Sequence, residues 1–149
     1  MGLSDDLGAG PVGLDTAVFI YYMEEHPQYI GVLDPFFEAV AAGRIPVVTS
    51  SLTLLEVLVV PLRVGDAALA AKYEAILTRS HGVQLIEIDR GQLRSAAQLR
   101  AAHGALRTPD ALQLAAALHT GCSVFVTNDR DLPRMPGLRT LQLRDYARH

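Results

Sequence analysis

The sequence is poor in cysteine and lysine and has no long apolar run. Its single cysteine, Cys122, excludes an intrachain disulfide, and its five histidines fall at no zinc-binding spacing. The longest apolar run, at residues 50–62, is interrupted by Glu56 and falls short of the roughly 20 residues that span a bilayer. The opening residues "MGLSDDLGAGP" have neither the basic nor the apolar region of a secretion signal. We therefore expect a cytoplasmic protein without a membrane partner, with Cys122 buried as a small hydrophobic residue.

What remains is the composition of a folded domain. Half of the 149 residues are apolar and 19% are charged, which excludes a disordered or fibrous chain. This length fits one domain, so we expect a single domain over residues 1–149, with residues 1–10 as a flexible N-terminal extension.

Charge is distributed unevenly along the chain. Residues 1–89 hold 12 acidic and 4 basic residues, whereas residues 90–149 hold 4 acidic and 9 basic ones. Only Lys72 among the 13 basic residues is a lysine, and the planar fork of arginine suits bidentate phosphate contacts. The composition permits a phosphate-bearing partner, but an ordinary solvated surface explains it equally well.

Short apolar runs alternate with longer helical segments, which is typical of an α/β domain with a mostly parallel sheet. Strands are expected at residues 11–14, 45–50, 83–88, 123–127 and 138–143. Helices are expected at residues 16–25, 31–43, 66–80, 91–104 and 108–121, together with one that is capped by Ser50 or Ser51, carries Glu56 and ends at Pro61. In the last of the numbered segments, Thr108 is expected as N-cap, Pro109 as the first helical residue and Gly121 as terminator.

Four acidic residues are candidates for one site. In open parallel sheets, ligands bind beyond the carboxyl ends of the strands. Asp15 follows the first strand and Asp129 follows the fourth, so both are expected at that edge. Asp110 lies in the first turn of its helix, and Glu56 lies about a turn and a half into a helix that begins at a strand end. If these helices run back from the same edge, all four carboxylates converge within metal-binding distance.

Each acid also has an ordinary structural explanation. Asp110 at a helix N-terminus is favoured by the helix dipole, Asp15 fits an N-cap, and Asp129 fits a turn. Glu56 fits this kind of explanation least well, because a carboxylate in an apolar helix must be paired, for example with Arg63. Convergence would instead require divalent cations to offset the repulsion, and Mg²⁺ or Mn²⁺ suits oxygen ligands better than zinc does. Such ions hold phosphodiesters and activate water.

Four segments in this order resemble the PIN-domain ribonucleases, in particular the VapC-type toxins of toxin–antitoxin pairs. They are "LDTAVFIYYMEEHP", "VVTSSLTLLEVLVVPLR", "LRTPDALQLAAAL" and "FVTNDRDL", and the resemblance runs from about Val12 to Leu143. The resemblance implies a three-layer PIN-like α/β fold, with a mainly parallel sheet of about five strands flanked by helices. It also implies a pocket that binds Mg²⁺ or Mn²⁺ and cleaves RNA, a homodimer, and inhibition by a cognate antitoxin.

By match to the family's motifs, Asp15, Glu56, Asp110 and Asp129 form the acidic quartet, and Thr127 is the hydroxyl residue that helps organise it. We expect Asp15 and Asp129 as direct metal ligands, because strand ends place them most rigidly. Asp110 and Glu56 are expected to bind metal directly or through water, and one of them can act as general base.

Further residues beside the quartet are candidates for supporting roles. Arg107 and Arg130 are candidate phosphate contacts or solvated arginines, and Asn128 is a substrate-positioning residue or a turn residue. Asp131 is an additional acid that can act behind the metal ligands.

Two rival functions stay open at this point. A phosphoaspartyl hydrolase or receiver domain also places an aspartate after the first strand, but it needs a lysine near the acids, and Lys72 lies mid-helix. The hydrolase signature also needs an aspartate where this chain has Ala17. A non-catalytic PIN-like module that binds RNA or protein is the other alternative, although loss of catalysis normally leaves an acid missing.

Overall fold

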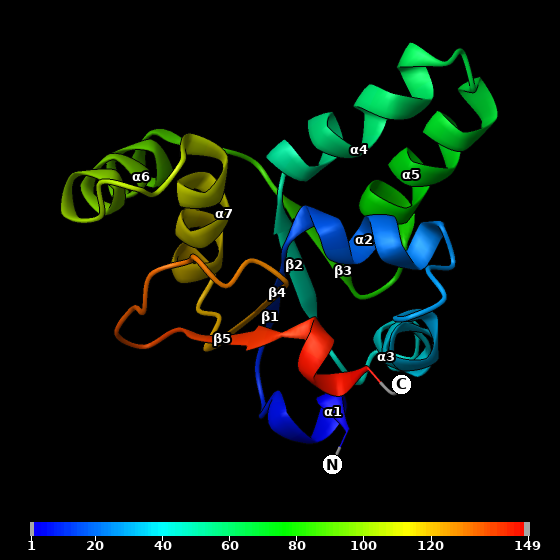
Figure 1. The fold of residues 1–149 in the computed structure, drawn as a ribbon, viewed down its shortest axis with the longest axis horizontal. Helices are drawn as coiled ribbons and strands as arrows, with labels where there is room; N and C mark the ends of the chain where they lie inside the picture. The colour runs from blue at the N-terminus through cyan, green and yellow to red at the C-terminus, as the bar shows by residue number, and fades with distance from the viewer. Residues whose placement is uncertain (1, 148–149) are drawn as a thin grey trace.

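Five parallel strands form one sheet in the order β3-β2-β1-β4-β5 (Figure 1). The computed structural model describes residues 2–147. The strands are β1 (Val12–Leu14), β2 (Val47–Ser50), β3 (Val83–Ile86), β4 (Val124–Thr127) and β5 (Arg139–Gln142). The pairing is parallel throughout, so all carboxyl ends meet at one edge. The first strand of the chain, β1, is the central strand of the sheet, with β2 on one side and β4 on the other.

Helices cover both faces of the sheet (Figure 1). The helices are α1 (Leu3–Asp6), α2 (Thr16–Met23), α3 (Ile30–Ala41), α4 (Leu52–Arg63), α5 (Ala67–Arg79), α6 (Arg90–Ala102), α7 (Thr108–His119) and the 3₁₀ helix η1 (Leu143–Tyr146). Alternate residues of the strands enter two separate cores, as the pleat requires. Val124 and Val126 pack with α2, α3 and α5, whereas Phe125 between them packs with α6 and α7. The predicted three-layer α/β fold with five strands is confirmed, and its sheet is wholly parallel.

Gly13 lets α7 approach the sheet closely. A Cβ atom on Gly13 would lie 2.9 Å from Cδ1 of Phe125 and 3.0 Å from Cβ of Ala117. Neither neighbour has room to move, because Phe125 and Ala117 are both buried in the core between β4 and α7. The close approach places the N-terminus of α7, which carries Asp110, near the end of β1.

Two helix ends that we predicted from a proline or a capping residue are placed differently in the structure. The helix that carries Glu56 does not end at Pro61 but continues to Arg63. Pro61 is buried, and its carbonyl accepts the backbone N–H of Asp66, so packing in the last turn outweighs the missing N–H of proline.

The second difference concerns α7. Arg107 is its N-cap residue and Thr108 is already helical, because the Thr108 hydroxyl accepts a bond from Arg100 and does not cap the helix. The start of α4 agrees with prediction, since Ser51 is its N-cap residue and the hydroxyl of the preceding Ser50 accepts the N–H of Leu52.

Residues 2–10, for which we expected a flexible extension, include a short helix that packs on the domain. Residues Leu3–Asp6 form α1, and Leu3 and Leu7 are buried in the same core as α3. The Tyr146 hydroxyl near the end of the described chain donates to Asp6 Oδ2 over 2.6 Å. The first and last helical segments of the described chain, α1 and η1, therefore lie close together (Figure 1). No helix within residues 2–147 has both the length and the apolar character needed to cross a bilayer.

Candidate active site

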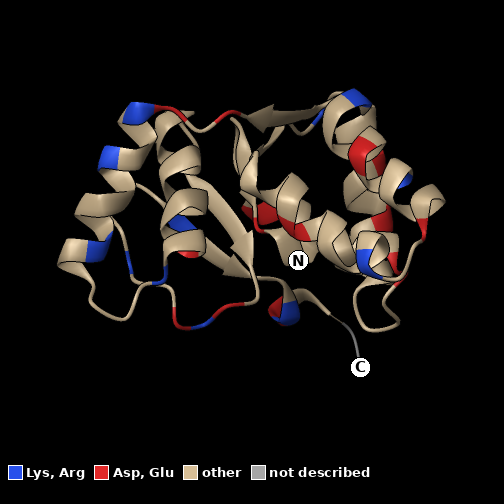
Figure 2. Cartoon of the chain, turned by 90° about the horizontal axis from the view of Figure 1, so that it is seen from above, with Lys and Arg blue, Asp and Glu red and all other residues tan. Residues whose placement is uncertain are grey.

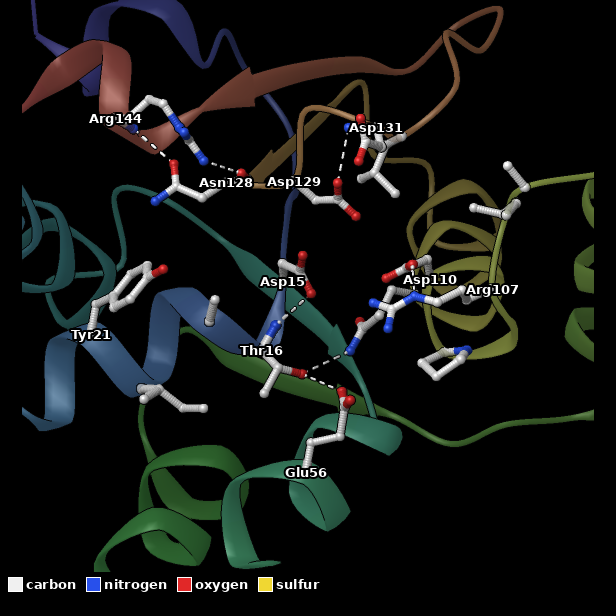
Figure 3. A pocket seen from close by; sticks show the side chains of 17 residues that line it. Asp15, Thr16, Tyr21, Glu56, Arg107, Asp110, Asn128, Asp129, Asp131 and Arg144 are labelled. Carbon is white, nitrogen blue, oxygen red and sulfur yellow. Dashed lines mark hydrogen bonds and ion pairs between the residues drawn. The ribbon is translucent and has the colours of Figure 1, made fainter. Parts of the chain in front are cut away.

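All four predicted acids line one pocket beyond the carboxyl ends of the strands (Figure 3). Its volume is about 1030 Å³. Asp15 follows β1, Asp129 follows β4, Glu56 comes from α4 and Asp110 from the first turn of α7. The parallel topology brings these segments, which are far apart in the chain, to one edge of the sheet.

Asp15 is fixed at the floor of the pocket by three elements. Its backbone N–H donates to the carbonyl of Val126 in β4 (3.0 Å), which ties the end of β1 to its neighbour. Asp15 caps α2, because Oδ1 accepts the N–H of Thr16 (2.9 Å). Oδ2 accepts the hydroxyl of Thr127 (2.7 Å), and the Thr127 oxygen accepts the N–H of Asp129 (3.0 Å). Thr127 thus links two acids of the predicted quartet.

Glu56 is held by a hydroxyl and not by an arginine. The Thr16 hydroxyl donates to Glu56 Oε1 over 2.7 Å. Within residues 2–147 the one ion pair joins Arg107 and Asp110, so the salt bridge to Arg63 that would explain Glu56 structurally is not present. The carboxylate in the apolar helix therefore belongs to the pocket.

A buried glutamine organises the hydroxyls behind Glu56. Gln113 in α7 is 3% exposed, and its Nε2 donates to the hydroxyl oxygens of Thr53 (2.7 Å) and Thr16 (3.2 Å). Its Oε1 lies 3.4 Å from the N–H of Ser50 at the end of β2. One amide thus connects α7 with α2, α4 and the sheet.

The protons in this network have one consistent direction. The Thr49 hydroxyl donates to the carbonyl of Leu14 (2.9 Å), so in its contact with Thr53 (2.7 Å) Thr53 must be the donor. Thr53 and Thr16 then both accept from Gln113, and the single Thr16 proton is free to bind Glu56. The network therefore presents a donor, not an acceptor, to the Glu56 carboxylate.

Burial and neighbouring carboxylates raise the pKa values of Asp15 and Asp110. Burial raises the pKa of Asp15 above its usual range, and the charges of Asp110 and Glu56 add to the rise, while hydrogen bonds from Thr127 and Thr16 oppose it. Burial also raises the pKa of Asp110, and the charge of Asp129 adds to it, although the nearby Arg107 guanidinium lowers it. These effects are those of carboxylates crowded together in a partly buried space.

The oxygen donors fit a hard divalent cation, but they are not arranged as a finished cage. Within the described chain, no group of three or more His, Cys, Asp or Glu side chains lies close enough to hold a metal ion. The expectation that all four carboxylates converge within metal-binding distance is therefore not met. The physical reason is that the carboxylates repel one another and bind donors of the protein instead, as Asp110 does with Arg107 and Asp129 with the N–H of Asp131. Carboxylate oxygens are nevertheless the ligands that a hard cation prefers, and a bound cation would offset the repulsion that contributes to the raised pKa values.

The supporting residues divide into two groups. Asn128, Asp131 and Arg107 line the pocket with the acids, whereas the exposed Arg130 is not among the lining residues. Arg107 pairs with Asp110 (Nε to Oδ2, 3.3 Å). In place of Arg130, the structure brings Arg144 of η1 to the pocket.

Sequence reasoning missed Thr16, Gln113 and Arg144. Gln113 carried a readable signal, because it is a polar side chain on the otherwise apolar "ALQLAAAL" segment, as Glu56 is in its helix. Thr16 was hidden by its ordinary place beside a helix cap, and Arg144 by the many arginines around it.

Known structures resemble this chain in fold. A chain of the VapBC2 complex of Rickettsia felis, bound to a DNA fragment from its promoter, matches with a TM-score of 0.71 and 18% identity, over 89% of this chain and 98% of that one. A chain of a toxin–antitoxin complex from Klebsiella pneumoniae matches with a TM-score of 0.64 and 20% identity, over 87% and 95%. A chain of DNA-bound VapBC from Salmonella typhimurium matches with a TM-score of 0.61 and 22% identity, over 89% and 97%. At these identities the likeness establishes the fold alone.

A comparison with curated proteins gave no match. The family model of the PIN domain, however, matches residues 12–138, which include the strands β1 to β4 and all four acids of the pocket, and end just before β5. The chain therefore belongs to the PIN domain family.

Proposed function

We propose that this protein is a metal-dependent ribonuclease that hydrolyses RNA phosphodiester bonds and acts as the toxin of a type II toxin–antitoxin pair. The observation that carries the proposal is the meeting of Asp15, Glu56, Asp110 and Asp129 in one pocket. The fold-level likeness to chains of toxin–antitoxin complexes supports the toxin assignment, with a cognate antitoxin and a second copy of the chain as partners.

Asp15 and Asp129 would bind Mg²⁺ or Mn²⁺, because the Thr127 hydroxyl holds the two residues in a fixed relation at the strand ends. When bound, such a cation holds the phosphate and lowers the pKa of a water molecule. Glu56 and Asp110 each bind one donor of the described chain, through Oε1 and Oδ2, and keep the other oxygen for water. Because its pKa is raised, Asp110 is a stronger proton acceptor than an ordinary aspartate is.

The rival enzyme class has less support. A phosphoaspartyl site needs a lysine beside its acids, and Lys72 lies exposed on α5 and does not line the pocket. A non-catalytic RNA- or protein-binding module is the alternative that experiment must separate from the nuclease.

The test is cleavage of RNA by purified protein with magnesium and with EDTA. We expect cleavage only with magnesium, and none by Asp15→Asn, which keeps the shape of the side chain but removes its charge. Asp34→Asn on the exposed face of α3 is the matched control and should cleave as wild type does. Cleavage by Asp15→Asn at the wild-type rate would refute the proposal, and metal-independent binding without cleavage of any RNA would favour the non-catalytic module.

A further inference from the structure

The arginine-rich C-terminal part places one unpaired guanidinium in the acidic pocket. All nine basic residues after residue 89 are arginines, and several lie along α6, away from the acids (Figure 2). Arg107 and Arg144 line the pocket from opposite sides of the acids (Figure 3). Arg107 is paired with Asp110, whereas Arg144 makes no ion pair within residues 2–147. Arg144 is therefore the arginine whose charge is available to a ligand of the pocket.

Asn128 holds Arg144 in place at two points. The backbone N–H of Arg144 donates to Asn128 Oδ1 (2.9 Å), and its Nη2 donates to the Asn128 carbonyl oxygen. Asn128 directly precedes Asp129, so these bonds fix the guanidinium relative to a predicted metal ligand. An arginine that is already ordered loses less conformational entropy when it binds a ligand.

Two buried N–H donors beside this contact have no acceptor. Asn128 Nδ2 cannot exchange places with Oδ1, because Oδ1 must accept from the Arg144 backbone, and Nδ2 is buried without a partner. Arg144 Nε is buried without a partner as well. Buried donors are nearly always paired in folded proteins, so an orphaned pair indicates a missing ligand or water. A bound water molecule or a ligand would supply the acceptors that these two groups lack.

We propose that Arg144 binds a backbone phosphate next to the scissile bond of a single-stranded RNA. This inference rests on the proposed function. The acids of the pocket would repel a small anion. If a cation held the scissile phosphate of an RNA strand at the acids, the next phosphate of that strand would lie farther from the acids. The planar fork of arginine binds phosphate through two parallel hydrogen bonds. Arg144 lies to one side of the acids (Figure 3), on the path that we propose for that neighbouring phosphate.

The test compares Arg144→Gln and Arg144→Lys with Arg130→Gln. Arg130 is exposed, lies outside the pocket and loses the same charge, so it is the matched control. Binding of a fluorescent single-stranded RNA is measured by anisotropy in an Asp15→Asn background, which prevents turnover. We expect Arg144→Gln to raise Kd about tenfold, as loss of a charge-assisted hydrogen bond does, and to reduce the slope of log Kd against log salt by about 0.7. Arg144→Lys should keep the slope and lose part of the affinity.

A second measurement locates the phosphate. RNAs that carry one uncharged methylphosphonate linkage at successive positions are bound to both proteins. The wild-type protein should bind more weakly to an RNA whose methylphosphonate lies beside the mapped cleavage position. In Arg144→Gln the same methylphosphonate should cause no further loss of affinity, because the substitution and the uncharged linkage remove the same interaction. The Arg144 backbone bond to Asn128 survives substitution of the side chain, so the variants should fold, which thermal melting checks.

The outcomes separate this inference from the proposed function. Cleavage by wild type with unchanged Kd, salt slope and linkage profile in Arg144→Gln overturns the role of Arg144 alone. RNA binding that depends on Arg144 without any cleavage supports Arg144 and overturns the nuclease. Absence of RNA binding at every salt concentration overturns both.

Discussion

The hydroxyl of Thr16 lies 2.7 Å from Oε1 of Glu56 and donates a hydrogen bond to it. This contact joins the residue after Asp15 to an acid that lies 40 positions later in the chain. It explains how a carboxylate is tolerated in the apolar helix α4 without a cation, since a hydrogen bond to a charged acceptor offsets part of its desolvation cost.

The first prediction concerns this contact. Thr16→Val keeps the shape of the side chain but leaves Glu56 Oε1 without its donor, so we expect the free energy of unfolding to fall by about 1–3 kcal/mol. RNA cleavage should fall by about tenfold or more, because the carboxylate loses its orientation. Thr16→Ser retains the hydroxyl and should stay near wild type in both urea denaturation and cleavage rate. Full activity in Thr16→Val would show that Glu56 needs no such support.

The second prediction concerns Gln113. Gln113→Met removes the amide that donates to Thr16 and Thr53, so stability should fall by about 1–3 kcal/mol and kcat should fall with it. The control is Gln92→Met in α6, where an equally buried glutamine donates to the Glu87 carbonyl away from the pocket. That variant should lose stability and keep its kcat. If both variants lose stability and neither loses activity, Gln113 serves the fold alone.

The third prediction concerns pH and charge in metal-free buffer. The pKa of Asp15 is raised in the folded protein, chiefly by burial and further by Asp110 and Glu56. The folded state therefore holds a proton at pH values where the unfolded chain has lost it, and the free energy of unfolding falls as pH rises above the ordinary value of 3.8. Glu56→Gln removes one of the repelling charges. We expect its melting temperature at pH 7 in EDTA to exceed that of wild type, with a difference that shrinks as pH is lowered toward 3.8.

The control for this measurement is Glu74→Gln on the exposed face of the neighbouring helix α5, which changes net charge equally and should not alter the melting temperature in this way. A lower melting temperature for Glu56→Gln than for wild type would mean that the Glu56 charge stabilises the fold. Magnesium should reverse the order, because wild type gains more from the cation than a variant with fewer carboxylates does.

The fourth prediction concerns Cys122. The thiol is buried, and burial raises its pKa, so the reactive thiolate is depleted as well as shielded. We expect slow labelling by iodoacetamide at pH 8 in the native protein and rapid labelling in urea, measured by mass spectrometry. Equal rates in both conditions would mean that the core between α7 and β4 opens readily.

The order of the elements and the edge at which the acids lie could be predicted from the sequence. Apolar runs such as 123–127 and the amphipathic segments between them have different periods, and this local property identifies strands and helices. Because a parallel sheet aligns its carboxyl ends, the placement of Asp15 and Asp129 followed from the element order alone. The errors at Pro61 and Thr108 arose where packing and the bond from Arg100 decided a helix end.

Tertiary structure alone decided which side chains bind one another in the site. In sequence, Thr16 is a residue after a helix cap, Gln113 is a polar residue in an apolar segment and Arg144 is one arginine among 12, and nothing local shows which side chains they bind. Their partners lie on other elements, as far as 97 positions away for Thr16 and Gln113, so only the docking of α7 against α2 and α4 defines the contacts. Local periodicity determined where the carboxylates would gather, and the packing of the helices determined what holds each of them there.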